Sequence, residues 1–409
     1  MSDNSVERRG NIDEDNKQNI PSLSFNKEEW TNSDLGSIST VQDGTHSTPH
    51  YVEEGIPFFS VETITSDVPP KYISQEEHDN LIKRCKPKQN DILLTRIGTL
   101  CESKLITWDF DFSIYVSLAL ISDIQIYPEF LNQYIKTNYY KKEYIKRSLL
   151  LAVPQKINLK DLKETIVKFP SISEQKKIAD FLDTIDRKIE LMEKKYKLFN
   201  DYKRAFIQSL PLTCKEDLKI SKWSFIPLND CMYEHETKST GQEEVYSVSV
   251  YEGLINQIEH LGRSYSAEDT SKYNLVKPGD IVYTKSPTGN FPLGIIKQSH
   301  LNKNVIVSPL YGVFTPTSYE LGYILEAFFE SSIQCNNYLH PLVQKGAKNT
   351  MNITNKTFLS KKIHVPTDIN EQKRIYKVIK VINEKLELIN HELLVNKAFK
   401  KSLLSKMFC

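Results

Sequence analysis

The segment DGTHSTPHY holds the residues whose types and spacing come closest to a metal site. Asp43, His46 and His50 place one carboxylate and two imidazoles in a short stretch of chain. A zinc site usually needs a fourth ligand, with Cys or His pairs at recognised spacing. Gly44 and Pro49 instead favour a turn, in which short polar side chains hydrogen-bond the backbone or a nucleic acid. We therefore expect no metal here.

A second pattern, DIVYTK, could be taken for part of a nuclease site because Asp280 precedes Lys285 on a strand-like run. Such a site needs at least one more carboxylate in register. The chain also contains no GxxxxGK[ST] phosphate loop and no GxGxxG motif. An adenine methyltransferase would need an Asn/Asp-Pro-Pro-aromatic motif around its flipped base, and none is present. The sequence thus predicts no catalytic residue.

Composition indicates a soluble protein of several domains. The 409 residues leave room for two or three domains, and the 53 basic and 52 acidic residues nearly cancel to a net charge of +1. That balance argues against indiscriminate coating of nucleic acid but allows local basic surfaces. The longest apolar runs, such as YVSLALI, are too short to span a bilayer. The polar N-terminus lacks the apolar stretch of a secretory signal, so we expect a cytoplasmic protein with a disordered tail over residues 1–20.

The two halves of the sequence repeat the same landmarks in the same order. EQKKI at residues 174–178 returns as EQKRI at 371–375, each a few residues after a proline. Upstream, INLKDL corresponds to MNITNK, KQNDILLTRIGT to KPGDIVYTKSPTG, and Trp30 before Leu35 to Trp223 before Leu228. An internal repeat of this kind predicts two structurally equivalent modules.

Each EQ motif leads into a long helix with heptad spacing. The rows consist of Ile178, Leu182, Ile185, Ile189 and Met192 in the first copy, and of Ile375, Ile379, Ile382, Leu386 and Ile389 in the second. Two such helices of some 35 residues, each roughly 50 Å long, can pair as a coiled coil. A homodimeric coiled coil is the alternative. We favour pairing within the chain, antiparallel, with Asn396 and Lys400 helping to set the register.

The segments between the helices predict mixed modules, with strands first and a helix after. IPFFSV, DILLTRI, DIVYTK and VIVSPLYGVF are typical of strands. PEFLNQYIKTNYYKKEYI and SYELGYILEAFFESSI are typical of helices that pack on them. The predicted fold class is α+β, with two tandem α/β modules and two long helices. The expected boundaries are 21–169 for module 1, 170–211 for the central helix, 212–366 for module 2 and 367–409 for the C-terminal helix.

Taken together, these motifs resemble the specificity subunits of type I restriction-modification systems. The resemblance rests on the EQ-containing helix after a proline, present twice, on the GD-strand motif, and on DGTHSTPHY followed by GIPFFSVETI. The DGTH-x-TP string is similar to a recurring signature of the family's target-recognition domains. One departure is that module 2 has NDCMYEHETKSTGQEE where that string would stand, so its target cannot be inferred from module 1.

The resemblance implies two target-recognition domains, each reading a short DNA half-site, separated by conserved helices in an antiparallel coiled coil. It implies modification subunits, two of them, that dock on the coiled-coil region and methylate adenine. It also implies restriction subunits that add ATP-driven translocation and cleavage. The chain itself would be non-catalytic and bind no cofactor, whereas the complex would use S-adenosylmethionine, ATP and magnesium. The heptad rows are then the candidate docking region.

Polar residues in loops beside the repeated strand motif are the candidates for reading double-stranded DNA, because Arg, Lys, Asn and Gln present paired donors or acceptors to base edges. The candidates are Thr45, His46, Thr48, Lys71, Arg96 and Thr99 in module 1, and Lys285, Ser286, Thr288, Asn290 and Lys345 in module 2. Two other functions stay open: a free-standing tandem DNA-binding regulator, and a solitary nuclease or methyltransferase, against which the motif search speaks.

Arg96→Ala is the first substitution that the sequence suggests. Loss of a base-reading side chain is expected to cost roughly 1–3 kcal/mol of binding free energy and to relax one base position. The affinity for DNA and the methylated sequence are the measurements. If both stay unchanged, assignment of the Arg96 loop to DNA is wrong.

Overall fold

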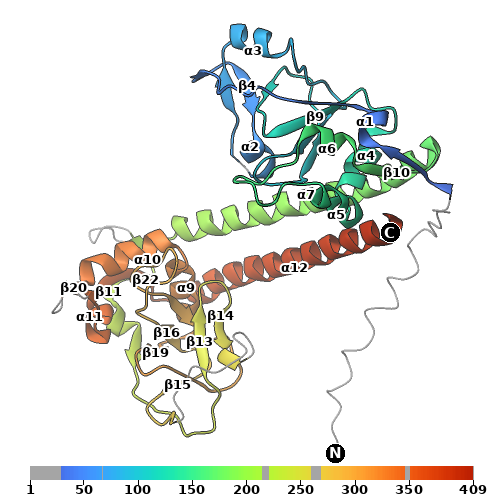
Figure 1. Cartoon of the computed structure of the whole chain (residues 1–409). Coiled ribbons are helices and arrows are strands. Elements are labelled where there is room, and N and C mark those ends of the chain that lie inside the picture. Colours follow the sequence, from blue (N-terminus) through green and yellow to red (C-terminus); the bar gives the residue numbers. More distant parts are fainter. Residues whose placement is uncertain (1–28, 67, 214–220, 259–268, 346–350, 409) are drawn as a thin grey trace, which may run out of the picture. The chain divides into compact units, whose positions relative to one another are not determined.

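A computed structural model describes residues 29–66, 68–213, 221–258, 269–345 and 351–408 of the chain. Contacts divide it into two units, Met1–Met192 with Glu392–Cys409, and Glu193–His391. Each unit therefore contains one mixed module together with parts of both long helices (Figure 1). The tail expected over residues 1–20 lies outside the described residues.

Module 1 is built on two four-stranded sheets. The first has the order β2-β9-β6-β7 and is antiparallel throughout. The second has the order β3-β5-β4-β8, in which β4 and β8 run parallel. The bounds are β2 (Thr40–Asp43), β3 (Tyr51–Val52), β4 (Ile56–Phe59), β5 (Lys71–Ile73), β6 (Ile92–Thr95), β7 (Ser103–Leu105), β8 (Ser113–Ile114) and β9 (Leu118–Ser122).

Helices pack on both sheets of module 1. They are α1 (Leu35–Ile38), α2 (Val61–Thr65), α3 (Gln75–Leu81), α4 (Pro128–Ile135), α5 (Asn138–Lys146) and α6 (Leu159–Lys163). The segment expected to be one helix is divided into α4 and α5 because the Thr137 hydroxyl accepts a hydrogen bond from Tyr140 N at 3.1 Å and starts a new helix. Tyr134, Tyr140 and Tyr144 are buried in the core between these helices and the sheet.

Module 2 repeats the central sheet in the order β12-β19-β16-β17, again antiparallel. Its other strands form the pairs β13-β14, β15-β18 and β20-β21. The bounds are β12 (Met232–Glu234), β13 (Tyr246–Ser249), β14 (Gly253–Asn256), β15 (Asn274–Val276), β16 (Ile281–Tyr283), β17 (Ile296–Gln298), β18 (Val305–Val307), β19 (Gly312–Pro316), β20 (Gln344–Lys345) and β21 (Met351–Asn352). VIVSPLYGVF, expected as one strand, is thus two, separated by a turn in which Tyr311 N donates to Ser308 O at 3.0 Å.

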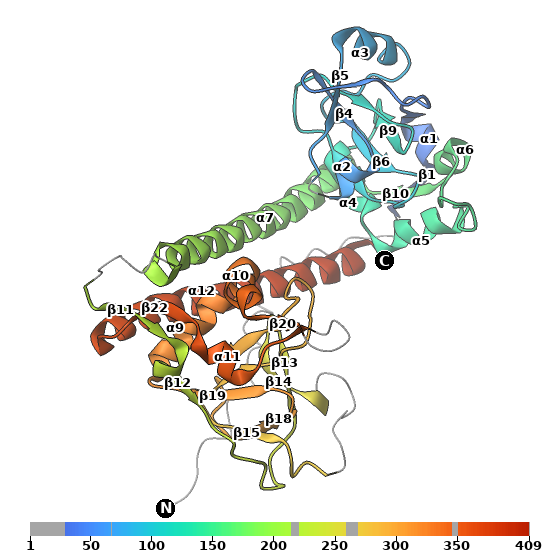
Figure 2. The same cartoon turned by 90° about the vertical axis from the view of Figure 1, so that its left-hand side faces the viewer.

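In module 2 two helices follow β19, as α4 and α5 follow β9 in module 1 (Figure 2). The helices of the module are α9 (Tyr319–Phe329), α10 (Ser332–Leu339) and α11 (Asn355–Ser360), with short 3-10 turns η3 (Pro211–Thr213), η4 (Leu228–Asp230) and η5 (His340–Leu342). The predicted single helix ends at Phe329, and Ser331 caps α10 through a bond from Gln334 N. Phe314, Phe329 and Phe358 meet in the core.

A two-stranded ladder closes each module where the chain enters and leaves it. In module 1, β1 (Thr31–Asp34) pairs antiparallel with β10 (Ile166–Phe169). In module 2, β11 (Trp223–Pro227) pairs antiparallel with β22 (Lys362–Pro366). A long helix follows each of these final strands.

The two long helices are α7 (Ile172–Ser209), of 38 residues, and α12 (Ile369–Phe408), of 40 residues. Within unit 1 they run antiparallel, because Asp186 contacts Lys400 and the later Met192 contacts the earlier Asn396. Lys400 therefore pairs across the helices as expected. No helix among the described residues is long and apolar enough to cross a membrane.

The residues of the heptad rows pack in two different places. Met192, Ile382, Leu386 and Ile389 are buried along the helices, and Ile189 is half-buried. The first members of each row are buried in the core of their own module: Ile178, Leu182 and Ile185 in that of module 1, and Ile375 and Ile379 in that of module 2. At the far end of α12, Leu403, Met407 and Phe408 also enter the module 1 core.

A buried glutamine explains why the EQ motif recurs. Gln175 Nε2 donates to Pro170 O at 2.8 Å, and its Oε1 accepts from Tyr127 N, at the start of α4, at 2.8 Å. Gln372 Nε2 likewise donates to Pro366 O at 2.8 Å, and its Oε1 accepts from Ser318 Oγ, at the start of α9, at 2.6 Å. Each glutamine thus ties the first turn of a long helix to the same two points of its module.

Gln175→Ala is expected to lower the free energy of unfolding of unit 1 by about 1–3 kcal/mol, because the buried Tyr127 N–H and Pro170 carbonyl lose their partner. Lys177→Ala, on the exposed face of the same turn, is the matched control and is expected to change it by less than about 0.5 kcal/mol. Urea unfolding followed by circular dichroism measures both. Equal effects of the two substitutions would contradict the role given to Gln175.

Candidate nucleic-acid interface

Two equivalent hairpins carry predicted DNA-reading residues. Thr95, at the end of β6, accepts a hydrogen bond from Glu102 N at 2.9 Å through its hydroxyl. Thr284, after β16, accepts from Ile295 N at 3.1 Å in the same way. Both threonines are buried. The loops that follow, residues 96–101 and 285–294, therefore leave the two central sheets at the same place, although they differ in length and sequence.

A buried carboxylate with two arginine partners and one histidine partner lies beneath the module 1 loops. Asp43 Oδ2 accepts from His46 Nε2 at 3.0 Å and from the Arg96 guanidinium at 3.0 Å, and Asp43 Oδ1 accepts from Arg84 at 2.6 Å. The Asp43 side chain is 4% exposed. We call these four residues the Asp43 cluster. Both carboxylate oxygens are engaged by these side chains, and the described residues contain no group of three or more His, Cys, Asp or Glu placed to hold a metal ion.

Arg96 is not placed as the sequence predicted. Its side chain is 8% exposed, and besides Asp43 it donates to Val116 O at 3.0 Å and to Ile157 O at 3.2 Å. Burial lowers the pKa of Arg96, and the Asp43 charge opposes that shift. With its donors directed inward, Arg96 cannot present a fork to a base edge. It is a positioning residue that fastens three separate segments of the chain together.

Other predicted residues of module 1 are on the surface. His46, Thr48 and Thr99 are exposed, and Thr45 is half-buried. Thr45 N donates to Ile114 O at 3.1 Å, which joins the DGTH segment to the end of β8. Lys71 lies on β5, two strands from β8, with its ammonium group 4.4 Å from the centre of the Tyr51 ring. The structure thus brings the DGTH segment and the Arg96 loop together, and Lys71 contacts the Tyr51 end of DGTHSTPHY.

In module 2 four of the five predicted residues share one loop. Ser286, Thr288 and Asn290 are exposed, and Lys285 is half-buried with a positive φ of 60°. Burial lowers the pKa of Lys285, and Glu234 opposes that shift. Thr288 and Phe291 exchange backbone hydrogen bonds of 3.0 and 2.9 Å, which form a tight turn at the tip. The side chain of Lys345 lies outside the described residues.

A second buried carboxylate, which the sequence reasoning did not connect to the loops, lies beneath those of module 2. Asp280 Oδ2 accepts from His235 Nε2 at 2.8 Å and from Lys277 N at 2.7 Å, and Oδ1 accepts from Thr315 Oγ1 at 2.7 Å. His235 stands in the segment that replaces the DGTH string. The available signal was the repeated GD-strand motif, in which Asp280 directly precedes the strand.

Asp91 is the module 1 counterpart of Asp280 in the repeated motif before the strand. Its Oδ2 also accepts from the backbone N of the residue three earlier, Lys88, at 2.9 Å. Burial raises the pKa of Asp91 from its ordinary 3.8 to about 6, against the effect of the Lys88 hydrogen bond. The carboxylate of Asp91 is therefore less well compensated than that of Asp280, which has three partners.

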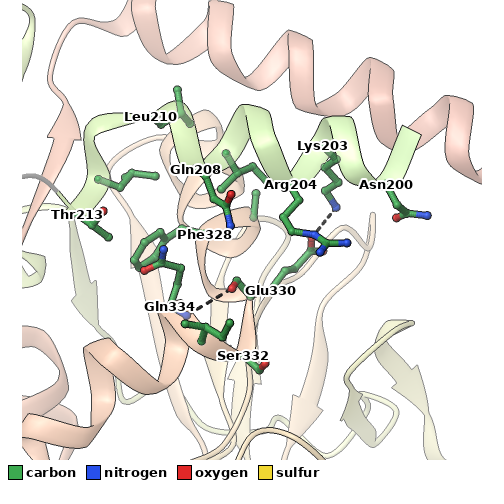
Figure 3. A pocket seen from close by; sticks show the side chains of 15 residues that line it. Asn200, Lys203, Arg204, Gln208, Leu210, Thr213, Phe328, Glu330, Ser332 and Gln334 are labelled. Carbon is green, nitrogen blue, oxygen red and sulfur yellow. Dashed lines mark hydrogen bonds and ion pairs between the residues drawn. The ribbon is translucent and has the colours of Figure 1, made fainter. Parts of the chain in front are cut away.

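A cavity of about 460 Å³ lies in unit 2, where the last turns of α7 pack on α9 and α10 (Figure 3). Lys203, from α7, forms an ion pair with Glu330 at its wall, and Arg204 and Gln208 also line it. None of the predicted DNA-reading residues lines this cavity. It therefore does not extend the interface formed by the loops.

The family model described as the type I restriction modification DNA specificity domain matches residues 27–198 and again residues 228–395. The chain belongs to this family. The two matched segments coincide with the two repeats, each comprising a module and most of a long helix. This confirms the resemblance and the fold class, with two tandem modules and two long helices.

Individual relatives agree with the family assignment. Over 121 residues, the chain is 31% identical to the type I restriction enzyme EcoBI specificity subunit of Escherichia coli, a match that spans 29% of this chain and only 25% of that relative. The S subunit of the type I restriction-modification system of M. genitalium has the same fold, with a TM-score of 0.61 at 14% identity, over 93% of this chain and 96% of that one. A chain from a structure on complex assembly and conformational transition of the type I R-M system matches with a TM-score of 0.50 at 12% identity, over 93% and 97% of the chains.

The Asp43 cluster generates a prediction that separates a positioning role from base reading. Arg96→Ala is expected to lower the free energy of unfolding of unit 1 by about 3 kcal/mol or more, because it leaves a buried charge less compensated. Arg84→Ala removes another arginine from the same carboxylate, but Arg84 is 58% exposed, and the expected loss is about 1 kcal/mol or less. Urea denaturation measures both. If Arg96→Ala keeps full stability and changes one base of the methylated sequence, Arg96 reads DNA after all.

Asp91→Asn is expected to stabilise unit 1 at neutral pH. Because the folded-state pKa of Asp91 is raised to about 6 from 3.8, its contribution is fully favourable below pH 3.8 and is lost as the pH rises through 6. The free energy of unfolding of the wild type minus that of Asp91→Asn should therefore fall by up to about 3 kcal/mol between pH 4 and pH 7. Urea midpoints across this range test it, and a pH-independent difference would contradict the raised pKa.

Proposed function

We propose that this chain is the DNA-recognition subunit of a type I restriction-modification complex, in which each module reads one half of a split DNA sequence. The observation that carries the proposal is the repetition of one scaffold with different exposed loops. The threonine hairpins and the glutamine ties are the same in both modules. The exposed residues that they position differ, as two different half-sites require.

The residues proposed to face DNA are those that the structure leaves exposed or half-buried in the loops. In module 1 they are Thr45, His46, Thr48 and Thr99, and in module 2 they are Lys285, Ser286, Thr288 and Asn290. Hydroxyl, amide and imidazole groups hydrogen-bond both base edges and phosphates. Lys71, which is exposed beside Tyr51 at the end of the DGTHSTPHY segment, is proposed as a phosphate contact.

The proposed partners dock on the outward faces of the long helices rather than on the heptad rows, which are buried. Both helices carry large apolar side chains that are exposed in this chain: Leu191, Leu198 and Tyr202 on α7, and Val381, Leu388, Leu394, Val395 and Phe399 on α12. Exposed apolar groups of this size favour protein contacts. We assign this surface to two modification subunits, one for each repeat, with restriction subunits completing the complex.

Chemistry in this proposal belongs to the partners. The modification subunits would use S-adenosylmethionine to methylate adenine, and the restriction subunits would use ATP and magnesium. The specificity chain would bind DNA and hold the subunits in register in the cytoplasm, without a catalytic residue or cofactor of its own. The absence of phosphate-loop and methyltransferase motifs from the sequence supports this division.

The test is a map of methylated adenines in cells that express the chain with its neighbouring methyltransferase, compared with cells that lack the chain. The expected result is a split motif of two short half-sites with a fixed gap, present only with the chain. Thr48→Ala with Thr99→Ala should relax the first half-site alone, and Thr288→Ala with Asn290→Ala the second alone. If the chain co-purifies with no methyltransferase yet binds DNA specifically, it is a free-standing DNA-binding protein and the proposal fails.

A further inference from the structure

The loop between α5 and α6 of module 1 exposes an unusual run of aliphatic side chains. Leu151 is 100% exposed and Val153 is 99% exposed, and beside them Leu149 and Leu150 are 45% and 43% exposed. Burying one such side chain stabilises a protein by about 1.5–3 kcal/mol, and here that burial is missing. A run of this kind on a loop tip indicates a surface that is covered when a partner binds.

Hydrogen bonds at its base hold this loop in place. Leu149 and Lys156 exchange two backbone bonds, of 2.7 and 3.4 Å, so the segment is a short hairpin. Gln155 O accepts from Gly98 N at 2.8 Å, and Ile157 N donates to Arg96 O at 3.0 Å. The aliphatic tip is thus joined directly to the hairpin loop of residues 96–101, and through Arg96 to the Asp43 cluster. It is therefore connected to the loop that carries Thr99.

Comparison of the two modules indicates whether DNA or a protein partner covers this loop tip. The bridge between Leu149 and Lys156 corresponds to the pairing of Gln344 with Asn352 in module 2, and in both modules a buried isoleucine follows. Between these positions the sequence of module 1 is LLAVPQ, whereas that of module 2 is KGAKNTM. A surface that docked a copy of the same subunit on each module would keep its apolar side chains in both. A surface that contacts different half-sites would not.

We propose that Leu151 and Val153 form an apolar wedge that inserts at a base step of the half-site read by module 1. Aliphatic side chains inserted in this way unstack a step and kink the duplex. Lys146 and Lys156, on either side of the loop, supply positive charge for the phosphates that flank the step. The wedge rests on the proposed DNA-recognition function and adds to it a contact that is apolar and specific to module 1.

The experiment uses the full chain and a duplex that carries the split sequence from the methylation map, with 2-aminopurine in turn at each adenine of the first half-site. Wild-type protein should raise the emission at one position, where the base is unstacked. Leu151→Ser with Val153→Ser should abolish that rise and weaken binding at least about tenfold. The slope of the logarithm of affinity against the logarithm of salt concentration should stay unchanged, because no phosphate contact is lost.

Two variants control for folding and for loss of any exposed aliphatic group. Leu151→Met keeps an aliphatic tip and should retain most of the affinity and the emission signal. Ile172→Ser, at an aliphatic position that is 52% exposed at the start of α7, should behave as wild type. Since Leu151 and Val153 contact solvent, the urea midpoint of the double variant should match that of the wild type.

Four outcomes would overturn the wedge. Unchanged affinity and emission in the double variant would show that the loop does not contact DNA. Loss of methyltransferase co-purification with unchanged DNA affinity would assign the loop to a protein partner. If the wild-type chain gives no split methylation motif, both the DNA-recognition function and the wedge are overturned. If the wild-type chain gives the motif and the double variant leaves it unaltered, only the wedge is overturned.

Discussion

The attachment of each module to its long helix depends on one buried amide side chain. Gln175 and Gln372 each bridge a proline carbonyl before the helix and the start of the first helix that packs on the module sheet. An amide is suited to this place because it donates and accepts at once and carries no charge to bury. Once these two bonds are made, the next apolar residues of the helix enter the module core. The direction of the helix relative to the sheet is then determined, and so is the direction of the loops.

Both modules place a buried carboxylate beneath the loops that we assign to DNA, but they compensate it differently. Asp43 is surrounded by two arginines and a histidine, whereas Asp280 has a histidine, a threonine hydroxyl and a backbone N–H. The two arginines of the Asp43 cluster come from distant segments and so fasten loops together, whereas the threonine hydroxyl and the backbone N–H at Asp280 carry no charge. The same scaffold therefore supports loops of different length without a shared set of ion pairs.

The sequence predicted the architecture well because both copies of the repeat contain the same local motifs. These are a proline, a capping residue, the EQ motif and heptad spacing. It could not predict which side chains of the loops face outward. Arg96 looked like a base reader by type and position, yet its neighbours Asp43, Val116 and Ile157 are far from it in the chain and turn it inward. The aliphatic tip at Leu151 was missed for the opposite reason, because an apolar run in a sequence is ordinarily read as core. Helix breaks at Thr137 and Ser331 were missed because heptad-like apolar spacing continues through them, whereas capping hydroxyls decide the boundary.

The pairing of β1 with β10, and of β11 with β22, brings the two ends of each module together. Thr31 lies opposite Phe169, and Trp223 opposite Pro366, so the chain enters and leaves a module on neighbouring strands. The segment between those two strands could therefore be replaced as one unit. The helix that follows would keep its place, provided that the ladder and the glutamine bonds are kept. Recombination between genes of this kind would then create a new pairing of half-sites in one event, while the surface offered to the other subunits stays as it was.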